Sequence, residues 1–325
     1  MKKSKSSLKN KSGLKNNGAL ENNAVCSHTA YGLKDFNLTH VFECGQCFRN
    51  RKLAENEYLV AASDRIVTMR IQRPEESGRC ESAETHVNLE ISPCTAEEFE
   101  GFWKKYLDLD RDYGAIKKRL CKDDEVMREA VHYGYGIRIL GQDLWETIIS
   151  FIISQNNNIP RIKGCIERLC ELAGKRLDSK LPHIDFEGGT DLRPYAFPTA
   201  EEIAGLTPRD LSGVRLGYRA KYILSVSQAI MENGLPESEE ELLKLMGVGP
   251  KVANCILLFG MAKYKSFPID VWVKKVMHEL YGLRQGDMQE MKSFAAEHFG
   301  NLGGFAQQYL FFYMRDKEST APQGK

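Results

Sequence analysis

The segment SEEELLKLMGVGPKVANCILLFG, residues 238–260, sets the architecture of the C-terminal half of the chain. It predicts a polar helix that ends at Met246 and an apolar helix that begins at Pro250, since proline is favoured at the first helical position. Between them, Gly247 and Gly249 allow positive φ angles and a close approach to the backbone, and the amides that follow can bind a phosphate group. The segment therefore predicts a sharp helical hairpin, although a Gly-x-Gly turn alone is common between helices.

Lys251 and Asp270 are the candidate catalytic residues near this hairpin. Lys251 lies in the first turn after Pro250, where the positive end of the helix and burial both disfavour an ammonium ion and favour a nucleophilic amine. Asp270 precedes another predicted helix, which begins at Val271, and a carboxylate there can stabilise positive charge that develops during a reaction. The alternative is a solvated lysine and an aspartate that only caps its helix.

The composition excludes several classes of protein. The chain has 325 residues, enough for two main bodies, and a net charge of +1, so any nucleic-acid surface must be a local basic patch. Nine irregularly spaced cysteines without an apolar signal segment indicate reduced thiols in a cytoplasmic protein. No apolar run approaches the roughly 20 residues that a membrane span needs, so no membrane partner is expected.

Apolar residues repeat with period two between residues 36 and 91. Positions 67, 69 and 71 share one face of a strand, positions 87, 89 and 91 share a face of another, and Glu57–Ala62 is a third candidate. Polar turns such as Arg73–Gly78 separate them. The first two segments predict half-buried strands, and with the third candidate they suggest an antiparallel sheet.

Helical periodicity replaces this pattern beyond Thr95. Three pairs have the spacing of a capping box and predict helix starts: Asp143 with Glu146, Ser238 with Glu241, and Asp287 with Glu290. The first helix, Leu144–Ser154, is apolar nearly all round, which is typical of a helix at the centre of a bundle. The last, about Phe305–Met314, contains a run of aromatic residues.

The expected fold class is α+β, with an N-terminal twisted antiparallel β-sheet domain packed on a mainly α-helical domain. The predicted division is a disordered basic tail at 1–27, the sheet domain with flanking helices at 28–135 and the helical domain at 136–325. The first interpretation of the lysine-rich tail is a segment that only keeps the protein solvated. The second is that its lysines attract DNA phosphates without sequence specificity.

The hairpin with Lys251 and the following Pro268-Ile269-Asp270 resembles the helix-hairpin-helix motif of a DNA glycosylase superfamily, in which a lysine at this position marks enzymes that also cleave the DNA backbone. From about Leu38 to Arg315 the chain resembles the 8-oxoguanine DNA glycosylase family. The resemblance implies a bifunctional glycosylase and AP lyase of base excision repair. In such an enzyme the lysine amine attacks C1′ of the damaged nucleotide, and a Schiff-base intermediate then allows β-elimination. It implies double-stranded DNA with 8-oxoguanine, preferably opposite cytosine, as the substrate, and a monomer.

Two motifs resemble family segments that open the duplex. In SQNNNIPR, residues 154–161, Asn156 is expected to fill the gap left by the flipped base and Arg161 to read the orphaned cytosine. In LGYRAKY, residues 216–222, Tyr218 resembles the wedge and Arg219 a second reader of cytosine. Taken singly, an Asn-rich turn is more often a cap and a tyrosine is more often core.

The lesion pocket is expected from segments far apart in the sequence. In FECGQCFR, residues 42–49, the carbonyl group of Gly45 resembles the family's acceptor for the N7 hydrogen of the oxidised purine. Cys255, four residues after Lys251, and Phe311 are expected to sandwich the base while Gln307 reads its Watson-Crick edge. Core packing is the rival interpretation for Phe311. The CxxC at 44–47 has no second cysteine pair, so no zinc is expected.

Two positions depart from the family pattern. Trp272 stands where the eukaryotic branch has a phosphate-contacting histidine, which makes the motif resemble bacterial members. Two roles are open for Trp272: its indole N–H contacts DNA, or its ring only packs against neighbouring residues. Met314 stands where the family has an aspartate near the purine. No organic cofactor is expected, and a monovalent or divalent cation at the hairpin carbonyls follows from the resemblance alone.

Two other functions stay open at this stage. One is a glycosylase for another damaged purine; its iron-sulfur branch is disfavoured because no cysteine follows Cys255. The other is a non-catalytic helix-hairpin-helix protein that only binds DNA. Such a module needs the glycine turn but neither Lys251 and Asp270 nor a base pocket.

Overall fold

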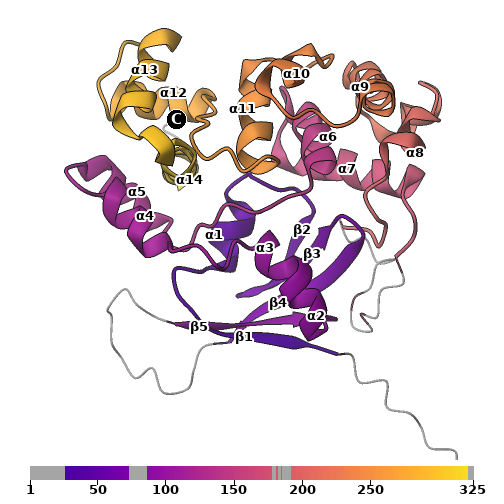
Figure 1. Ribbon diagram of the computed structural model, residues 1–325, viewed down its shortest axis with the longest axis horizontal. Coiled ribbons are helices and arrows are strands. Elements are labelled where there is room, and N and C mark those ends of the chain that lie inside the picture. Colours follow the sequence, from indigo (N-terminus) through magenta and orange to yellow (C-terminus); the bar gives the residue numbers. More distant parts are fainter. Residues whose placement is uncertain (1–25, 73–85, 178–180, 182–183, 185–191, 321–325) are drawn as a thin grey trace, which may run out of the picture.

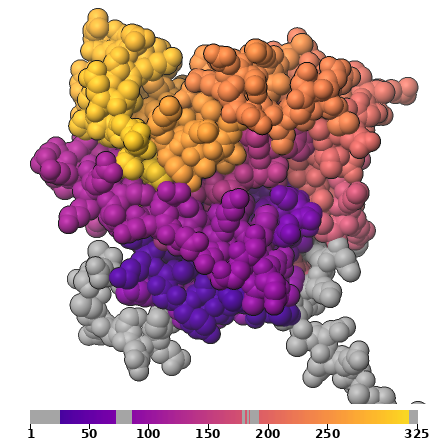
Figure 2. All heavy atoms as spheres, in the orientation of Figure 1, coloured from indigo at the N-terminus to yellow at the C-terminus, as the bar shows by residue number. Residues whose placement is uncertain are grey.

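The protein has the predicted α+β architecture, with an antiparallel sheet followed by a helical domain. The computed structural model describes residues 26–72, 86–177, 181, 184 and 192–320. The turn predicted at 73–78 and nearly all of the predicted tail lie outside the described residues. Figure 1 shows the sheet at one end of the molecule and the later helices at the other, and the space-filling view shows the same division by colour (Figure 2).

The sheet has five strands in the order β1-β5-β4-β3-β2, and each neighbouring pair is antiparallel. The strands are β1 His28–Leu33, β2 Asn50–Ala54, β3 Glu57–Ala62, β4 Arg65–Gln72 and β5 Val87–Ser92. The structure confirms the three predicted strands as β3, β4 and β5. In β5 the buried and half-buried residues alternate, as the period of two predicts.

Strand β3 differs from β5 because both of its faces are covered. Tyr58 and Val60 belong to the core that contains Trp103. Leu59 lies on the opposite face and packs with Leu192. A strand buried on both faces carries apolar residues at successive positions, which is what the sequence YLVAA shows.

The helices of the described residues follow the sheet, apart from α1, which lies between β1 and β2. In chain order, the α-helices are α1 Leu38–Glu43, α2 Ala96–Glu98, α3 Lys104–Tyr106, α4 Tyr113–Leu120, α5 Glu125–Tyr133, α6 Leu144–Ser154, α7 Ile159–Ala173, α8 Ala200–Ala204, α9 Arg219–Asn233, α10 Glu239–Lys244, α11 Pro250–Phe259, α12 Val271–Glu279, α13 Met288–His298 and α14 Gly303–Thr320. A π turn, η1 Phe99–Trp103, and two 3-10 turns, η2 Asp210–Val214 and η3 Gly300–Leu302, complete the set. The domain boundary predicted after residue 135 falls in the loop between α5 and α6 and stays a prediction.

The three predicted helix starts are confirmed by their N-caps. The side chains at the N-caps of α6, α10 and α13 each accept a hydrogen bond from the backbone N–H three residues later, at 2.9, 3.2 and 3.0 Å. The glutamates of these pairs do not complete the box, because they accept other amides; Glu146, for example, accepts the N–H of Ser63 at 3.0 Å. Both bonds of a capping box form instead between Thr199 and Glu202.

Helix α6 is the central helix that the sequence predicts. Eight of its eleven residues are buried, and Phe151 stacks on Phe259 of α11 with ring centroids 5.4 Å apart. This packing fixes the position of α11 relative to α6. Both the end of α6 and the start of α11 therefore open toward the same region.

The helical hairpin is present, with two differences from the prediction. Helix α10 ends at Lys244, before Met246, because Leu245 leaves the helical region with a ψ of 133°. Gly247 has the expected positive φ, 85°. Gly249 does not: its φ is −95°, because it is the N-cap of α11, and extended backbone is usual at an N-cap.

Two further observations concern the whole of the described chain. None of its helices combines the length and the apolar character that crossing a bilayer requires. Its eight cysteines are free thiols.

Replacing Gly247 tests the hairpin turn. We expect Gly247→Ala to destabilise the protein by at least about 1–2 kcal/mol, because alanine is strained at this φ. Its Cβ would also lie 2.5 Å from Cδ2 of Tyr222. Gly249→Ala is the matched control: no heavy atom lies within 4 Å of its Cβ, and the expected cost is below about 1 kcal/mol. Urea denaturation measures both, and equal losses would contradict the assigned turn geometry.

Candidate active site

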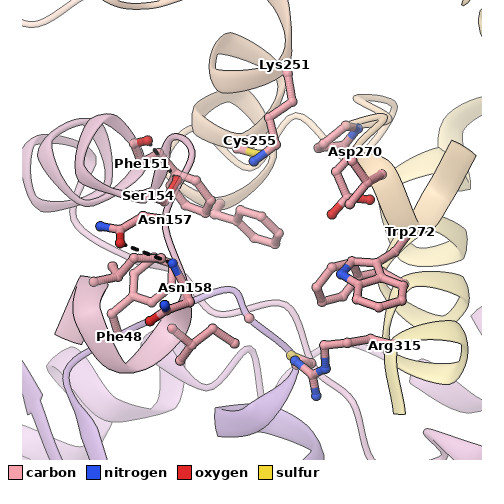
Figure 3. A pocket seen from close by; sticks show the side chains of 18 of the residues that line it. Phe48, Phe151, Ser154, Asn157, Asn158, Lys251, Cys255, Asp270, Trp272 and Arg315 are labelled. Atoms are coloured by element: carbon pink, nitrogen blue, oxygen red, sulfur yellow. Dashed lines mark hydrogen bonds between the residues drawn. The ribbon is translucent and has the colours of Figure 1, made fainter. Parts of the chain in front are cut away.

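A pocket of about 480 Å³ lies where α6, α7, α11, α12, α14 and the segment before β2 meet. The structure brings seven of the predicted site residues together in its lining: Gly45, Lys251, Cys255, Asp270, Trp272, Gln307 and Phe311. Figure 3 shows Lys251 extending from α11 toward Cys255, with Asp270 and Trp272 on the opposite side. Segments separated by more than 200 residues thus form one site.

Lys251 is the second residue of α11, directly after Pro250. Its side chain is exposed and its Nζ lies 5.8 Å from the ring centroid of Phe151. The expectation that burial contributes to its chemistry is therefore wrong for this structure, since the pocket mouth is open. The position at the positive end of a helix is as predicted.

Cys255 lies one turn after Lys251 on the same face of α11 and is buried. Burial raises the pKa of its thiol, and the neighbouring Lys251 ammonium acts in the opposite direction. The thiol is therefore a neutral, polarisable surface beside the amine. Such a surface suits contact with the face of a flat ring.

Asp270 is both the N-cap of α12 and a wall of the pocket. Its Oδ1 accepts the N–H of Val273 at 2.9 Å, so the capping role that the sequence allows is confirmed. Burial raises the pKa of the carboxyl group, while the Val273 amide and the positive charge of Lys251 lower it. A carboxyl group held in this balance can accept or return a proton more readily than a solvated aspartate.

Gly45, Gln307 and Phe311 form the inner part of the pocket. Gly45 has a φ of 77°, and a Cβ built on it would lie 3.1 Å from the Phe311 ring, so backbone and ring are in close contact. Gln307 is buried, and its Oε1 has no hydrogen-bond partner among the described residues. An unsatisfied buried acceptor that lines a pocket costs free energy until a ligand donates to it.

The other six predicted site residues lie outside this pocket. They are Asn156, Arg161, Tyr218, Arg219, Gly247 and Gly249. The two glycines form the hairpin turn next to Lys251.

Asn156 and Tyr218 lie together on the surface although 62 positions separate them. Asn156 is exposed, has a φ of 45°, and its Nδ2 lies 3.4 Å from the Tyr218 hydroxyl group. Tyr218 is 47% exposed, so it is not a core residue. A protruding ring beside a polar tip has the form of a wedge.

Arg219 and Arg161 are in different environments. Arg219 is buried, and its guanidinium group donates to the backbone oxygens of Gln155 and Asn156 and lies 4.5 Å from the Tyr218 ring. Arg161 is exposed in the first turn of α7, where its backbone N–H is capped by Asn158. Arg161 is therefore accessible as the structure stands, whereas Arg219 holds the Asn-rich turn.

Sequence reasoning missed other residues of the pocket lining, among them Phe48, Phe151, Gln308 and Arg315. Arg315 follows Phe311 by one helical turn, and its guanidinium group lies 5.4 Å from that ring. The spacing 307, 311, 315 on one helix face was the signal that could have identified it. Met314, by contrast, is buried in the helical core and does not line the pocket.

A helical hairpin whose second helix presents a lysine toward a partly buried aspartate and a slot for a flat base defines the helix-hairpin-helix class of DNA repair glycosylases. Comparisons with known proteins agree. The model of the 8-oxoguanine DNA glycosylase N-terminal domain matches residues 30–148, and that of the HhH-GPD superfamily of base excision DNA repair proteins matches residues 149–299.

Relatives of known sequence or structure narrow the class. A probable N-glycosylase/DNA lyase of Methanothermobacter thermautotrophicus is 30% identical over 59% of this chain and 68% of its own length. An N-glycosylase/DNA lyase of Arabidopsis thaliana is 28% identical over 89% of this chain and 80% of its own. The crystal structure of the Clostridium acetobutylicum 8-oxoguanine glycosylase/lyase, bound to DNA with cytosine opposite 8-oxoguanine, matches with a TM-score of 0.77 and 39% identity over 90% of this chain and 98% of that one.

The chain belongs to the 8-oxoguanine DNA glycosylase family. These relatives come from an archaeon, a plant and a bacterium, so a bacterial source stays a prediction.

Proposed function

We propose that the protein is a bifunctional DNA glycosylase and AP lyase that excises 8-oxoguanine from double-stranded DNA. The observation that supports this most strongly is the shared pocket, in which a lysine, an aspartate and a base-sized slot come from separate parts of the chain. A protein that only binds DNA needs no such pocket, so the non-catalytic alternative is disfavoured.

The proposed reaction begins with the neutral amine of Lys251. Its nitrogen forms a bond to C1′ of the flipped nucleotide while the bond from C1′ to N9 of the base breaks, and the base leaves with the electron pair and takes up a proton. The nitrogen of the resulting aminal then loses a proton, and the bond from C1′ to O4′ breaks while the ring oxygen takes up a proton, which gives an open-chain Schiff base. This Schiff base loses a proton from C2′, and the 3′ phosphate departs from C3′ by β-elimination with the electron pair of the broken C–O bond. The carboxylate of Asp270 stabilises the positive charge that develops on the sugar and takes part in proton transfer with the amine.

Recognition of the base rests on the inner pocket. The carbonyl group of Gly45 accepts the N7 hydrogen of 8-oxoguanine, and Gln307 reads the Watson-Crick edge. In normal guanine N7 is itself an acceptor, so two acceptors would face each other. Cys255 and Phe311 hold the two faces of the ring.

The surface residues open and hold the duplex. Tyr218 enters the stack and Asn156 fills the gap, which offsets the few kcal/mol that base flipping costs. Arg161 and Arg219 read the orphaned cytosine, and Arg219 exchanges its contacts within the protein to do so. The amides at Gly247 and Gly249 and the indole N–H of Trp272 bind phosphates.

A cation at the hairpin, a monomeric state and a cytoplasmic location remain proposals. Among the described residues, no three His, Cys, Asp or Glu side chains gather to hold a metal ion. A hairpin cation would therefore be held by backbone carbonyl oxygens, and a dependence of DNA affinity on potassium at constant ionic strength would test it.

Removing the amine of Lys251 tests the mechanism. We expect the wild type to form a covalent adduct with 8-oxoguanine DNA in the presence of borohydride, because a Schiff base is reducible, and we expect Lys251→Gln to form none. Lys263→Gln is the matched control, since it removes the same charge from another exposed lysine. Full lesion release by Lys251→Gln would refute the assigned nucleophile.

Asp270→Asn separates the chemical role from the structural one. Asparagine also caps helices, so α12 is retained while the carboxylate is lost. We expect kcat to fall about 100-fold or more, with the affinity for lesion DNA changed less than about threefold. Single-turnover kinetics and fluorescence anisotropy measure the two. A proportional loss of both would contradict a transition-state role.

Arg161→Ala tests the reading of the opposite base. We expect it to reduce the preference for cytosine over adenine opposite 8-oxoguanine by about tenfold, because a forked contact to a base edge is worth roughly 1–3 kcal/mol. Arg161→Lys keeps the charge but not the fork, so it should restore DNA affinity without restoring the preference. Excision against all four opposite bases measures this. If Arg161→Ala kept the wild-type preference for cytosine over adenine, Arg161 would not be a reader of the opposite base.

A further inference from the structure

The turn formed by Cys44, Gly45 and Gln46 is held on one side by a hydrogen bond from a distant helix. Gln308 of α14 is buried, and its Nε2 donates to the backbone oxygen of Cys44 at 2.8 Å. We propose that Gln308 is a positioning residue that orients the Gly45 carbonyl group and so sets the discrimination between oxidised and normal guanine. This inference rests on the proposed function.

The other side of the turn is fixed by the fully buried side chain of Gln46. Its Nε2 donates to the backbone oxygens of Val41 at 2.9 Å and Arg138 at 2.7 Å, and its Oε1 accepts the N–H of Leu140 at 2.8 Å. Gly45 therefore lies between two anchored residues. Within the described ranges no group donates a hydrogen bond to the carbonyl oxygen of Gly45 itself, so this oxygen is left for a ligand.

Packing restricts Gly45 further. Its φ of 77° belongs to the left-handed region, and the Phe311 ring contacts it closely, with 3.1 Å to a built Cβ. Rotation of the Gly45 peptide thus requires either movement of Phe311 or loss of the bond from Gln308. Removing the Gln308 amide leaves the buried oxygen of Cys44 unsatisfied and makes such a rotation favourable.

Two adjacent glutamines of α14 have different tasks in this arrangement. Successive residues of a helix point about 100° apart, so Gln307 and Gln308 face different partners. The Gln307 Oε1 has no partner among the described residues, whereas the Gln308 amide is engaged with the turn. One helix therefore fixes the distance between the group that reads the Watson-Crick edge and the group that reads N7.

The test compares two activities that share Lys251 but differ in their need for the base. Excision of 8-oxoguanine requires the Gly45 carbonyl group, whereas β-elimination at a preformed abasic site does not. For Gln308→Met and the isosteric Gln308→Glu, we expect single-turnover excision opposite cytosine to fall about tenfold or more, and cleavage of abasic-site DNA to change less than about twofold. A misplaced acceptor loses its hydrogen bond within a few tenths of an ångström.

Leu310→Val is the matched control on the same helix. Leu310 is buried in the helical core, so its truncation lowers stability without touching the turn, and the ratio of the two activities should not change. A wild-type ratio in both Gln308 variants would overturn the proposal, as would an equal loss of both activities in them.

Hydrogen exchange of the turn gives a readout that does not depend on activity. We expect the amides of residues 43–47 to exchange at least about fivefold faster in Gln308→Glu than in the wild type, because the turn has lost its anchor, while those of α6 are unchanged. Unchanged exchange in the turn would overturn the proposal even if the variants lacked activity. Failure of the proposed function looks different, since the wild type itself would then release no 8-oxoguanine.

Discussion

The partly desolvated carboxyl group of Asp270 is the constraint around which the site is organised. It caps α12 through the Val273 amide, and burial opposes its charge. The positive charge of Lys251 offsets part of that cost, which couples the start of α11 to the start of α12.

The pocket is assembled across the boundary of the two bodies. The sheet domain supplies the turn around Gly45, and the helical domain supplies α11, α12 and α14. Helix α6 links these parts, because Phe151 stacks on Phe259 of α11 and its ring centroid lies 5.8 Å from that of Phe48, which follows the turn. A small shift between the bodies would move the Gly45 carbonyl group, the proposed N7 acceptor, relative to Gln307, so the geometry of the pocket depends on the rigidity of the whole core.

Much of this arrangement follows from the sequence, and the failures have physical causes. Period-two patterning located β4 and β5, and cap residues located α6, α10 and α13, because both signals are local. The double burial of β3 depends on residues 181 and 192, far along the chain, so no local pattern reveals it. The expected burial of Lys251 was wrong because its side chain lies at the open mouth of the pocket. The expected positive φ of Gly249 was wrong because this residue is the N-cap of α11 and has the extended backbone of a cap. The Gln308 contact joins residues 264 positions apart, which no local pattern predicts.

The internal engagement of Arg219 has a consequence for the contact with the orphaned cytosine that we propose for it. Its guanidinium group already satisfies the carbonyl groups of Gln155 and Asn156, so contact with a base exchanges one set of bonds for another instead of adding new ones. The proposed contact with cytosine therefore has a cost within the protein, because the bonds that hold the Asn-rich turn must break before the guanidinium group can donate elsewhere. The shape of that turn and the availability of Arg219 are two aspects of one set of hydrogen bonds.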